Sequence, residues 1–255
     1  QRDPMMNRRL YSPFRRIVAA LRIRPTVLGL LLITTPAMAW WNEEWASRRQ
    51  ITVDGGTTGA DIGGTVADFP LLIRLHAGNF PYFTELAENG KDLRFMLDDK
   101  TPLKHDVEKV DAFNELGLVW VRLPAVQGGS VSEAFSMYYG NANAPDGSEP
   151  KALYDASQAL VYHFGEGQTL PQDATAFGTH AASSGAITEP TGWIGAAAKF
   201  TGAGPIVINP APQLAVDPAK GWTFSAWVKI DQAQAADASL LEAREGANAI
   251  ELAFQ

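Results

Sequence analysis

Apolar and polar residues alternate along most of the chain, in runs of strand length. A period of two places successive side chains on opposite faces of a sheet, and these runs are rich in β-branched and aromatic residues. Turn-forming Gly, Asp, Asn and Pro residues separate the runs. Six of these alternating runs lie in the first part of the chain, at residues 49–53, 69–75, 92–97, 103–110, 118–123 and 134–139. This pattern predicts antiparallel strands packed as a β-sandwich.

The alternation resumes after a polar stretch with Gly and Pro at residues 146–151, which predicts a linker at 149–158. One short helix is expected, at residues 81–89, ended by Gly90. We therefore expect an all-β chain of two antiparallel, jelly-roll-like β-sandwich domains, at 40–148 and 159–255, the second truncated because the sequence stops in or just after a strand. Further strands are predicted at 160–164, 196–200, 205–208, 223–230, 239–243 and 250–254.

The N-terminal segment differs from the rest in charge. Residues 1–39 carry seven arginines and one acid, followed by an apolar run at 26–35 and the small-residue triplet 37–39. A basic start, a short apolar stretch and an A-x-A site are typical of a secretory signal peptide, here cleaved between Ala39 and Trp40. The residues before Met5 or Met6 look like upstream read-through. An uncleaved amphipathic anchor is the alternative.

Charge and composition exclude several classes of protein. The chain has 255 residues, a formal net charge of −7 and no cysteine, so disulfides, thiolate zinc sites, iron–sulfur clusters and a cysteine nucleophile are all excluded. Without residues 1–39, fourteen basic side chains face twenty-seven acidic ones. Such an acidic body argues against nucleic acid as a partner. The signal peptide predicts an exported protein of the periplasm or cell envelope, and without cysteine this protein must be stabilised by its apolar core alone.

Two sets of motifs carry a resemblance to known families. The first set is Trp40-Trp41-x-x-x-Trp45-x-x-Arg48, Asp68-Phe69-Pro70, Gly90 to Phe95, Thr101-Pro102-Leu103, Val119-Trp120-Val121 and Met137 to Asn141; the second is Tyr162-His163-Phe164, Asp173, Lys199-Phe200-x-Gly202 and Thr223 to Val228. The first set resembles the uncharacterised-domain family numbered 2341. The second resembles the concanavalin A-like, laminin-G jelly roll, of which only the N-terminal part is present.

In bacteria this pair of domains is similar to the periplasmic extension that precedes a MotA/TolQ/ExbB proton-channel domain. The resemblance thus implies a channel segment beyond residue 255, which would be the chain's only contact with a membrane. Asp173 lies in a loop of the part that resembles calcium-dependent lectins, so the resemblance allows it to be an oxygen ligand of Ca²⁺.

The tryptophans offer the most suggestive candidate site. Exposed indoles stack on sugar rings, and Trp40, Trp41 and Trp45 lie close together in the sequence. Tryptophan is mostly buried in proteins, however, so these three could instead close one end of the sandwich. Trp120 and Trp227 stand in the middle of predicted strands, and we expect both in the core.

The titratable residues give weaker signals. Asp106 and Glu108 share a face of one predicted strand, while the adjacent His105 points away; this set invites a metal or acid–base interpretation, but a solvated strand face is the commoner outcome. His163 lies in an apolar strand and is expected to be a hydrogen-bonded core histidine. Asp92 and Arg94 share a face and could form a structural ion pair.

No catalytic motif stands out in the chain. It has no H-E-x-x-H, G-x-S-x-G, phosphate-binding loop or dinucleotide-binding glycine pattern, and no E-x-D-x-x-E strand of the kind that concanavalin A-like glycoside hydrolases carry. The sequence therefore predicts a non-catalytic, extracytoplasmic module that binds a glycan or a cell-envelope protein. A concanavalin A-like hydrolase whose catalytic strand is missing, and a structural adhesin or spacer domain, are the alternatives.

Overall fold

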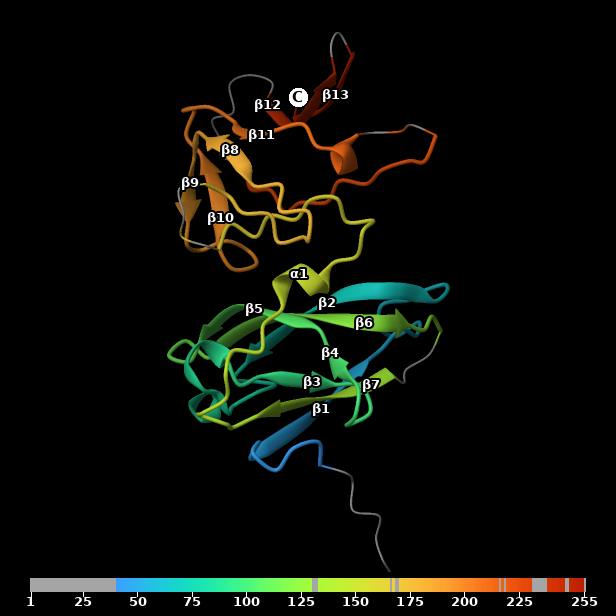
Figure 1. Ribbon diagram of the computed structural model, residues 1–255, viewed down its shortest axis with the longest axis vertical. Coiled ribbons are helices and arrows are strands. Elements are labelled where there is room, and N and C mark those ends of the chain that lie inside the picture. Colours follow the sequence, from blue (N-terminus) through green and yellow to red (C-terminus); the bar gives the residue numbers. More distant parts are fainter. Residues whose placement is uncertain are drawn as a thin grey trace, which may run out of the picture. The chain divides into compact units, whose positions relative to one another are not determined.

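The computed structural model describes residues 40–129, 133–165, 167, 170–215, 217, 219–230, 238–245 and 248–254 (Figure 1). The predicted signal peptide, with Ala39 of its cleavage site, lies outside the described residues. Where the chain is described, no helix combines the length and the apolar character needed to cross a membrane. The described chain is nearly all β-structure in antiparallel sheets, which confirms the predicted fold class.

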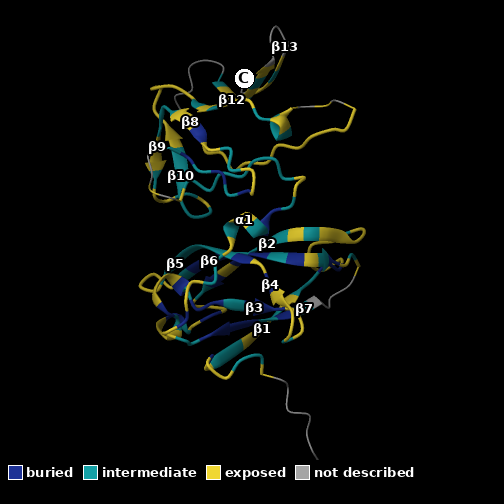
Figure 2. Ribbon diagram, in the orientation of Figure 1, coloured by how far each residue is buried: buried dark blue, intermediate teal, exposed yellow. Residues whose placement is uncertain are grey.

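Two antiparallel sheets build the first sandwich. One has the strand order β1-β7-β3-β4 and the other has the order β2-β6-β5. Their apolar side chains meet in one core, to which both sheets contribute, and Figure 2 shows this burial. The strands are β1 (Ser47–Val53), β2 (Val66–His76), β3 (Arg94–Met96), β4 (Pro102–Leu103), β5 (His105–Asp111), β6 (Leu116–Val126) and β7 (Glu133–Tyr139).

Alternation along β6 shows how the sequence pattern sets the two faces of its sheet. Val119, Val121 and Leu123 are buried in the core between the sheets. Because successive side chains point to opposite faces, Trp120 and Arg122 lie on the outer face. Later parts of the chain cover that face: the Arg122 guanidinium donates to the backbone oxygen of Ala152 at 3.2 Å.

The predicted helix at residues 81–89 is wrong in type. The segment forms two short 3-10 helices, η1 (Phe83–Glu85) and η2 (Glu88–Gly90). Asn89 has a φ of +57°, which no α-helix accommodates. A helix of so few residues is marginal by itself, and burial of Phe83 in the sandwich core determines the local conformation instead.

The predicted linker at 149–158 contains a short helix, α1 (Pro150–Leu153), which contacts β5 and β6. Leu153 and Tyr154 are buried, so this segment packs on the sandwich. In the described residues that follow it, the strands form three separate two-stranded antiparallel sheets. They pair β8 (Ala181–Ser184) with β11 (Ile206–Ile208), β9 (Ala186–Glu189) with β10 (Ala197–Phe200), and β12 (Ala238–Glu245) with β13 (Asn248–Phe254), and the 3-10 helix η3 (Pro212–Leu214) precedes the last pair.

Two strand predictions in this part are wrong. Residues 160–164 contribute only an isolated bridge between Tyr162 and Asp173, and residues 223–230 form no strand. Trp227, expected in the core, is 74% exposed. Alternation predicts a buried face only where a second layer covers it, and among the described residues nothing buries this indole.

Candidate functional site

The structure brings Trp40, Trp41 and Trp45 together, but in different environments. Trp45 is only 5% exposed, and its indole N–H donates to the backbone oxygen of Asp92 at 2.6 Å. The Trp41 ring packs on Trp45 with 4.8 Å between the ring centroids. Trp40 is 40% exposed and donates its indole N–H to the backbone oxygen of Trp45 at 3.0 Å. Trp45 is therefore a core residue, and Trp40 is the most exposed of the three, with Trp41 between them in exposure.

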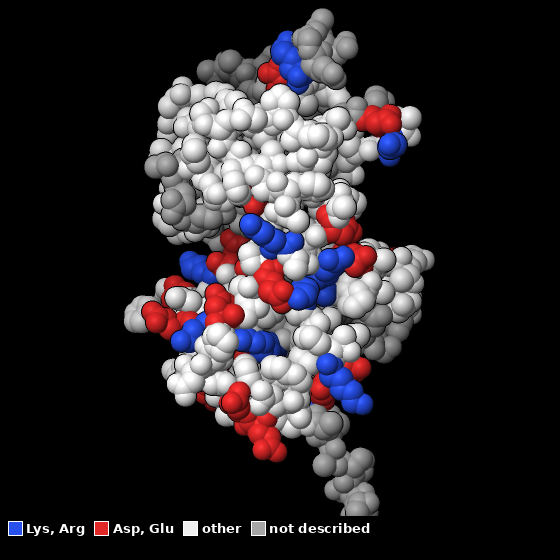
Figure 3. Space-filling model, viewed as in Figure 1, with Lys and Arg blue, Asp and Glu red and all other residues white. Residues whose placement is uncertain are grey.

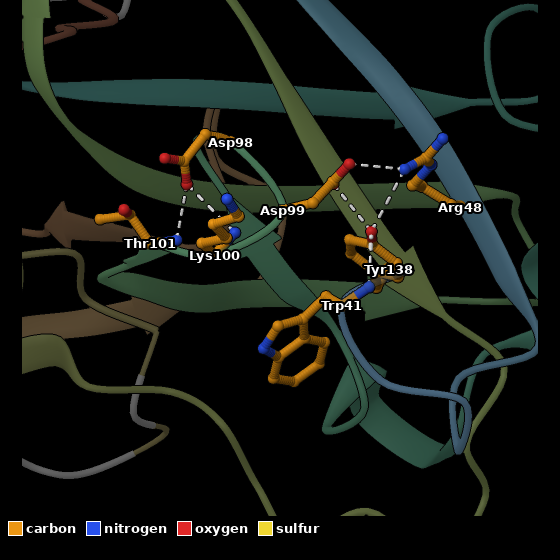
Figure 4. Close-up of polar contacts among 7 residues, drawn as sticks. All are labelled: Trp41, Arg48, Asp98, Asp99, Lys100, Thr101 and Tyr138. Carbon is orange, nitrogen blue, oxygen red and sulfur yellow. Dashed lines mark hydrogen bonds and ion pairs between the residues drawn. The ribbon is translucent and has the colours of Figure 1, made fainter. Parts of the chain in front are cut away.

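A polar network ties this aromatic cluster to the β1-β7-β3-β4 sheet (Figure 4). The Arg48 Nη1 atom lies 2.7 Å from an Asp99 oxygen, and both side chains are 16% exposed. The Tyr138 hydroxyl donates to the other Asp99 oxygen at 2.8 Å and accepts the backbone N–H of Trp41 at 3.3 Å. The hydrogen bond to Tyr138, together with the charge of Asp99, raises the pKa of Arg48 above its ordinary value.

The Arg48 guanidinium also lies over aromatic rings, 5.5 Å from the Trp40 centroid and 5.9 Å from that of Tyr138. Neighbouring Asp98 accepts the backbone N–H groups of Lys100 and Thr101 and so holds the turn between β3 and β4. Arg48, Asp99 and Tyr138 therefore bind one another, and this network fastens the segment before β1 to the sheet.

Replacing Tyr138 with phenylalanine is expected to lower the free energy of unfolding by about 1–2 kcal/mol. The ring packing stays, but Asp99 and the Trp41 N–H each lose a hydrogen-bond partner. Urea denaturation followed by tryptophan fluorescence measures the loss. Tyr82→Phe is the matched control, because no hydrogen bond of the Tyr82 hydroxyl is found in the described part of the chain; equal losses in the two variants would contradict the role of the network.

Asp92 and Arg94 do not form the predicted ion pair. Asp92 is fully buried, and its carboxylate accepts the backbone N–H groups of Ala87 at 2.9 Å, Gly140 at 2.7 Å and Asn141 at 3.1 Å. The Arg94 guanidinium donates to backbone oxygens instead, among them that of Pro145 at 2.8 Å. Each side chain thus clamps separate loops of the sandwich.

The prediction that Glu108 lies on a solvated strand face is also wrong. Its side chain is 3% exposed, and one of its oxygens accepts the Trp120 indole N–H at 3.3 Å and lies 2.8 Å from Nδ1 of His163. Nε2 of His163 in turn lies 2.8 Å from the Tyr154 hydroxyl. His163 is therefore a hydrogen-bonded, largely buried histidine, as predicted, and it joins the segment after α1 to β5.

A β-bulge explains the position of Glu108. Asp106 pairs with Trp120 and Val107 with Val119, but the next paired residue is Lys109, opposite Leu118. Glu108 is the extra residue, and a bulge of this kind re-aims the side chains around it. Nothing in the sequence marks the bulge. Glu108 nevertheless lies on the outer face beside Trp120, as alternation predicts, and it is buried because the segment that carries His163 covers it.

The neighbouring titratable groups respond to burial. Burial lowers the pKa of His105 to about 4, and its Nε2 atom is buried without a hydrogen-bond partner in the described structure. The ring packs against Phe95, 5.1 Å away between centroids. Burial also raises the pKa of Asp106. Both groups are thereby shifted toward their neutral forms.

Asp173, the candidate Ca²⁺ ligand, organises its own loop. One carboxylate oxygen accepts the backbone N–H groups of Val161 and Thr175, and the other accepts the Thr175 hydroxyl and the Thr179 N–H. The four bonds measure 2.8–3.1 Å, and the side chain is buried. Within the described ranges, no group of three or more His, Asp or Glu side chains is placed to hold a metal ion.

A different pair of tryptophans is the most exposed in the described chain. Trp193 is 79% exposed and Trp227 is 74% exposed, with their ring centroids 5.7 Å apart and the rings tilted by 34°. Trp193 also lines a hollow of about 190 Å³ together with Arg74, Lys109 and Leu116. The sequence does not indicate this pair, because the two residues are far apart in the chain and Trp227 stands in an alternating run.

Comparison with known proteins adds one finding. Residues 89–177 match the model of a family described as Domain of unknown function (DUF2341), which confirms the predicted resemblance to that family over this part of the chain. The matched range includes Glu108, Trp120, Tyr154, His163 and Asp173, the residues of the two buried networks. No curated protein and no solved structure matches the chain significantly.

Proposed function

We propose that the chain is a non-catalytic, extracytoplasmic binding module whose ligand is a glycan. The observation that carries the proposal is the exposed pair of Trp193 and Trp227. Large exposed aromatic residues that gather on a surface mark binding sites, whereas single ones are common and need no explanation. An indole offers a flat apolar face to the C–H groups of a sugar and costs little conformational entropy to order.

The other candidate groups support binding without catalysis. Glu108, Asp106 and His163 are the acidic and imidazole groups most suggestive of acid–base chemistry, and the Glu108 and His163 side chains are largely buried against one another. Asp173 has its oxygens occupied by hydrogen bonds within its loop. Placement in the cell envelope, and a role as the periplasmic extension of a proton-channel protein, stay predictions from the sequence.

We expect Trp193→Ala to weaken glycan binding by about five- to a hundredfold, because stacking of a flat ring on one aromatic side chain, as measured for nucleobases, is worth about 1–3 kcal/mol. Retention of the purified full chain on a panel of immobilised polysaccharides identifies the glycans bound, and titration calorimetry then compares the variants. Trp227→Ala should have a similar effect.

Two control variants make the result specific. Phe113→Ala removes another exposed aromatic side chain, 93% exposed, and should bind like the unmodified chain. Trp40→Ala tests the aromatic cluster at the start of the first sandwich and should also leave binding unchanged. A complete lack of retention on every glycan by the folded protein would overturn the proposed function, and loss of binding in Trp40→Ala alone would move the site to the aromatic cluster.

A further inference from the structure

Two cationic side chains lie in one row across the outer face of the β2-β6-β5 sheet. Arg74 on β2 and Lys109 on β5 both pair with Leu118, from opposite sides of β6. Residues that pair across strands direct their side chains to the same face, and neighbouring strands lie about 4.8 Å apart. The two cations therefore stand on one face with about 10 Å between their backbones.

The bulge at Glu108 creates this row. If β5 paired regularly along its whole length, Lys109 would lie three positions after Asp106 and would therefore face the sandwich core. With the bulge, both Asp106 and Lys109 pair with outward-facing residues of β6, Trp120 and Leu118.

Neither cation forms an ion pair or a side-chain hydrogen bond within the described residues, whereas Arg48, Arg122 and Lys104 each bind a carboxylate. The two acids beside Lys109 have other hydrogen-bond partners. The Glu108 carboxylate is buried against Trp120 and His163, and the Asp111 carboxylate, whose pKa is lowered by its hydrogen bonds to Asn114 and less strongly by the Lys109 charge, accepts the Asn114 side-chain amide. Near Trp193, the Glu189 carboxylate accepts the Thr191 hydroxyl. On the face in Figure 3, by contrast, basic and acidic side chains mingle over the first sandwich.

The hollow of about 190 Å³ gathers these groups with the exposed indole. Its lining includes Arg74, Lys109 and Trp193 and contains no Asp or Glu. It is smaller than the pockets of about 300–1,000 Å³ that hold drug-sized ligands, so one ring of a longer molecule suits it better. Gly195, with a φ of +64°, lets this loop approach the bulge, since a Cβ atom there would lie 2.6 Å from a Glu108 oxygen.

We infer that the hollow lined by Arg74, Lys109 and Trp193 binds an acidic saccharide, with the indole stacked on a sugar ring and the two cations on its carboxylate groups. The inference rests on the proposed glycan-binding function and specifies that the glycan bound at this site is acidic. A positive hollow is informative on this chain, in which acidic residues outnumber Lys and Arg by 28 to 21. Guanidinium and ammonium groups recognise carboxylates through charge-assisted hydrogen bonds.

Titration of the full chain with polygalacturonate and with its methyl ester tests the inference, because the two polymers differ only at the carboxyl group, which is an anion in the first and a neutral ester in the second. We expect the acid to bind at least tenfold more tightly than the ester at low salt, and less so as salt is raised. In the double variant Arg74→Gln, Lys109→Gln the two polymers should bind within about threefold of each other. The control Lys199→Gln, Lys220→Gln changes the net charge equally and should keep the preference.

The outcomes separate this inference from the function on which it rests. Equal binding of the acid and the ester, with both lost in Trp193→Ala, would leave a glycan-binding module but overturn its acidic ligand. Equal loss in the two double variants, or dextran sulfate binding as tightly as polygalacturonate, would also overturn it, since either result points to general charge attraction. Failure to bind any glycan would remove the proposed function and the inference together. Thermal unfolding of each variant establishes that it is folded.

Discussion

Asp92→Ala should lower the free energy of unfolding by about 4 kcal/mol, the largest loss we expect from a single substitution. The buried Asp92 carboxylate accepts three backbone N–H groups, one before η2 and two directly after β7. Each hydrogen bond to a charged group contributes about 1.5–3 kcal/mol, and the contributions of neighbouring bonds do not add fully. Alanine leaves three backbone donors without this acceptor, that of Ala87 buried and those of Gly140 and Asn141 partly buried, and opens a polar cavity. Chemical denaturation of the full chain, read by circular dichroism, measures the loss.

Asp98→Ala is the control for this prediction. Asp98 also accepts two backbone N–H groups, but in an exposed turn where water replaces the lost acceptor. We expect a much smaller loss in this variant. Asp92→Asn should lose less stability than the alanine variant, because its amide oxygen can still accept the N–H groups of Gly140 and Asn141 while its NH₂ group faces only the Ala87 N–H donor. A stable Asp92→Ala protein would show that the loops hold their positions without this carboxylate.

The stability of the protein should fall as the pH is lowered from about 6.5 to 4. His105 is buried and stays neutral in the folded chain down to a pKa of about 4, whereas in the unfolded chain it takes up a proton near 6.5. Between these values only the unfolded state gains the proton, so the free energy of unfolding drops by about 3 kcal/mol. Below pH 4 both states are protonated and this contribution changes no further.

Other groups can be separated from this effect. Asp106 acts in the opposite direction, because its raised pKa means that the folded state takes up a proton before the unfolded state does. Asp173 has a lowered pKa, owing to the N–H and hydroxyl groups that it accepts, and stabilises the fold until the pH falls below the ordinary carboxyl range. In His105→Phe the loss of stability that His105 causes between pH 6.5 and 4 should disappear, leaving only the smaller, opposite contribution of Asp106. Unfolding midpoints of the unmodified chain and of His105→Phe, measured between pH 6.5 and 4, test this assignment. An unchanged dependence of the midpoint on pH in the variant would contradict it.

The fold could be predicted from the sequence where one face of a strand packs in a core and the other face points outward. In β6, Val119, Val121 and Leu123 face a core built from two sheets, so alternation alone gave the strand and its orientation. The run at 223–230 alternates as clearly, yet it forms no strand in the described structure. A period of two measures how suitable a segment is for a sheet, and the partner strands that decide the outcome lie elsewhere in the chain.

The candidate site could be predicted only in part, for a related reason. The sequence could predict that Trp40, Trp41 and Trp45 lie close together, because they are neighbours in the chain. It could not predict the burial of Trp45, whose indole N–H is accepted by the backbone oxygen of the distant Asp92. Trp193 and Arg74 come from segments more than a hundred residues apart. The bulge that brings Lys109 beside them shifts by one residue which side chains of β5 face outward. The hydrophobic periodicity of the sequence does not reveal such a shift.

The bulge at Glu108 has a second consequence, for solubility. β5 is an outer strand of its sheet, and a regular outer strand presents free N–H and C=O groups on which another chain can add a strand. Over the first half of β5 these groups are occupied, since the Ser148 hydroxyl accepts the Val107 N–H and the Glu149 N–H donates to the His105 oxygen. Over the second half the bulge breaks the regular spacing, with charged Lys109 and Asp111 on either side of Val110. The same extra residue that shapes the hollow thus protects this edge from edge-to-edge aggregation.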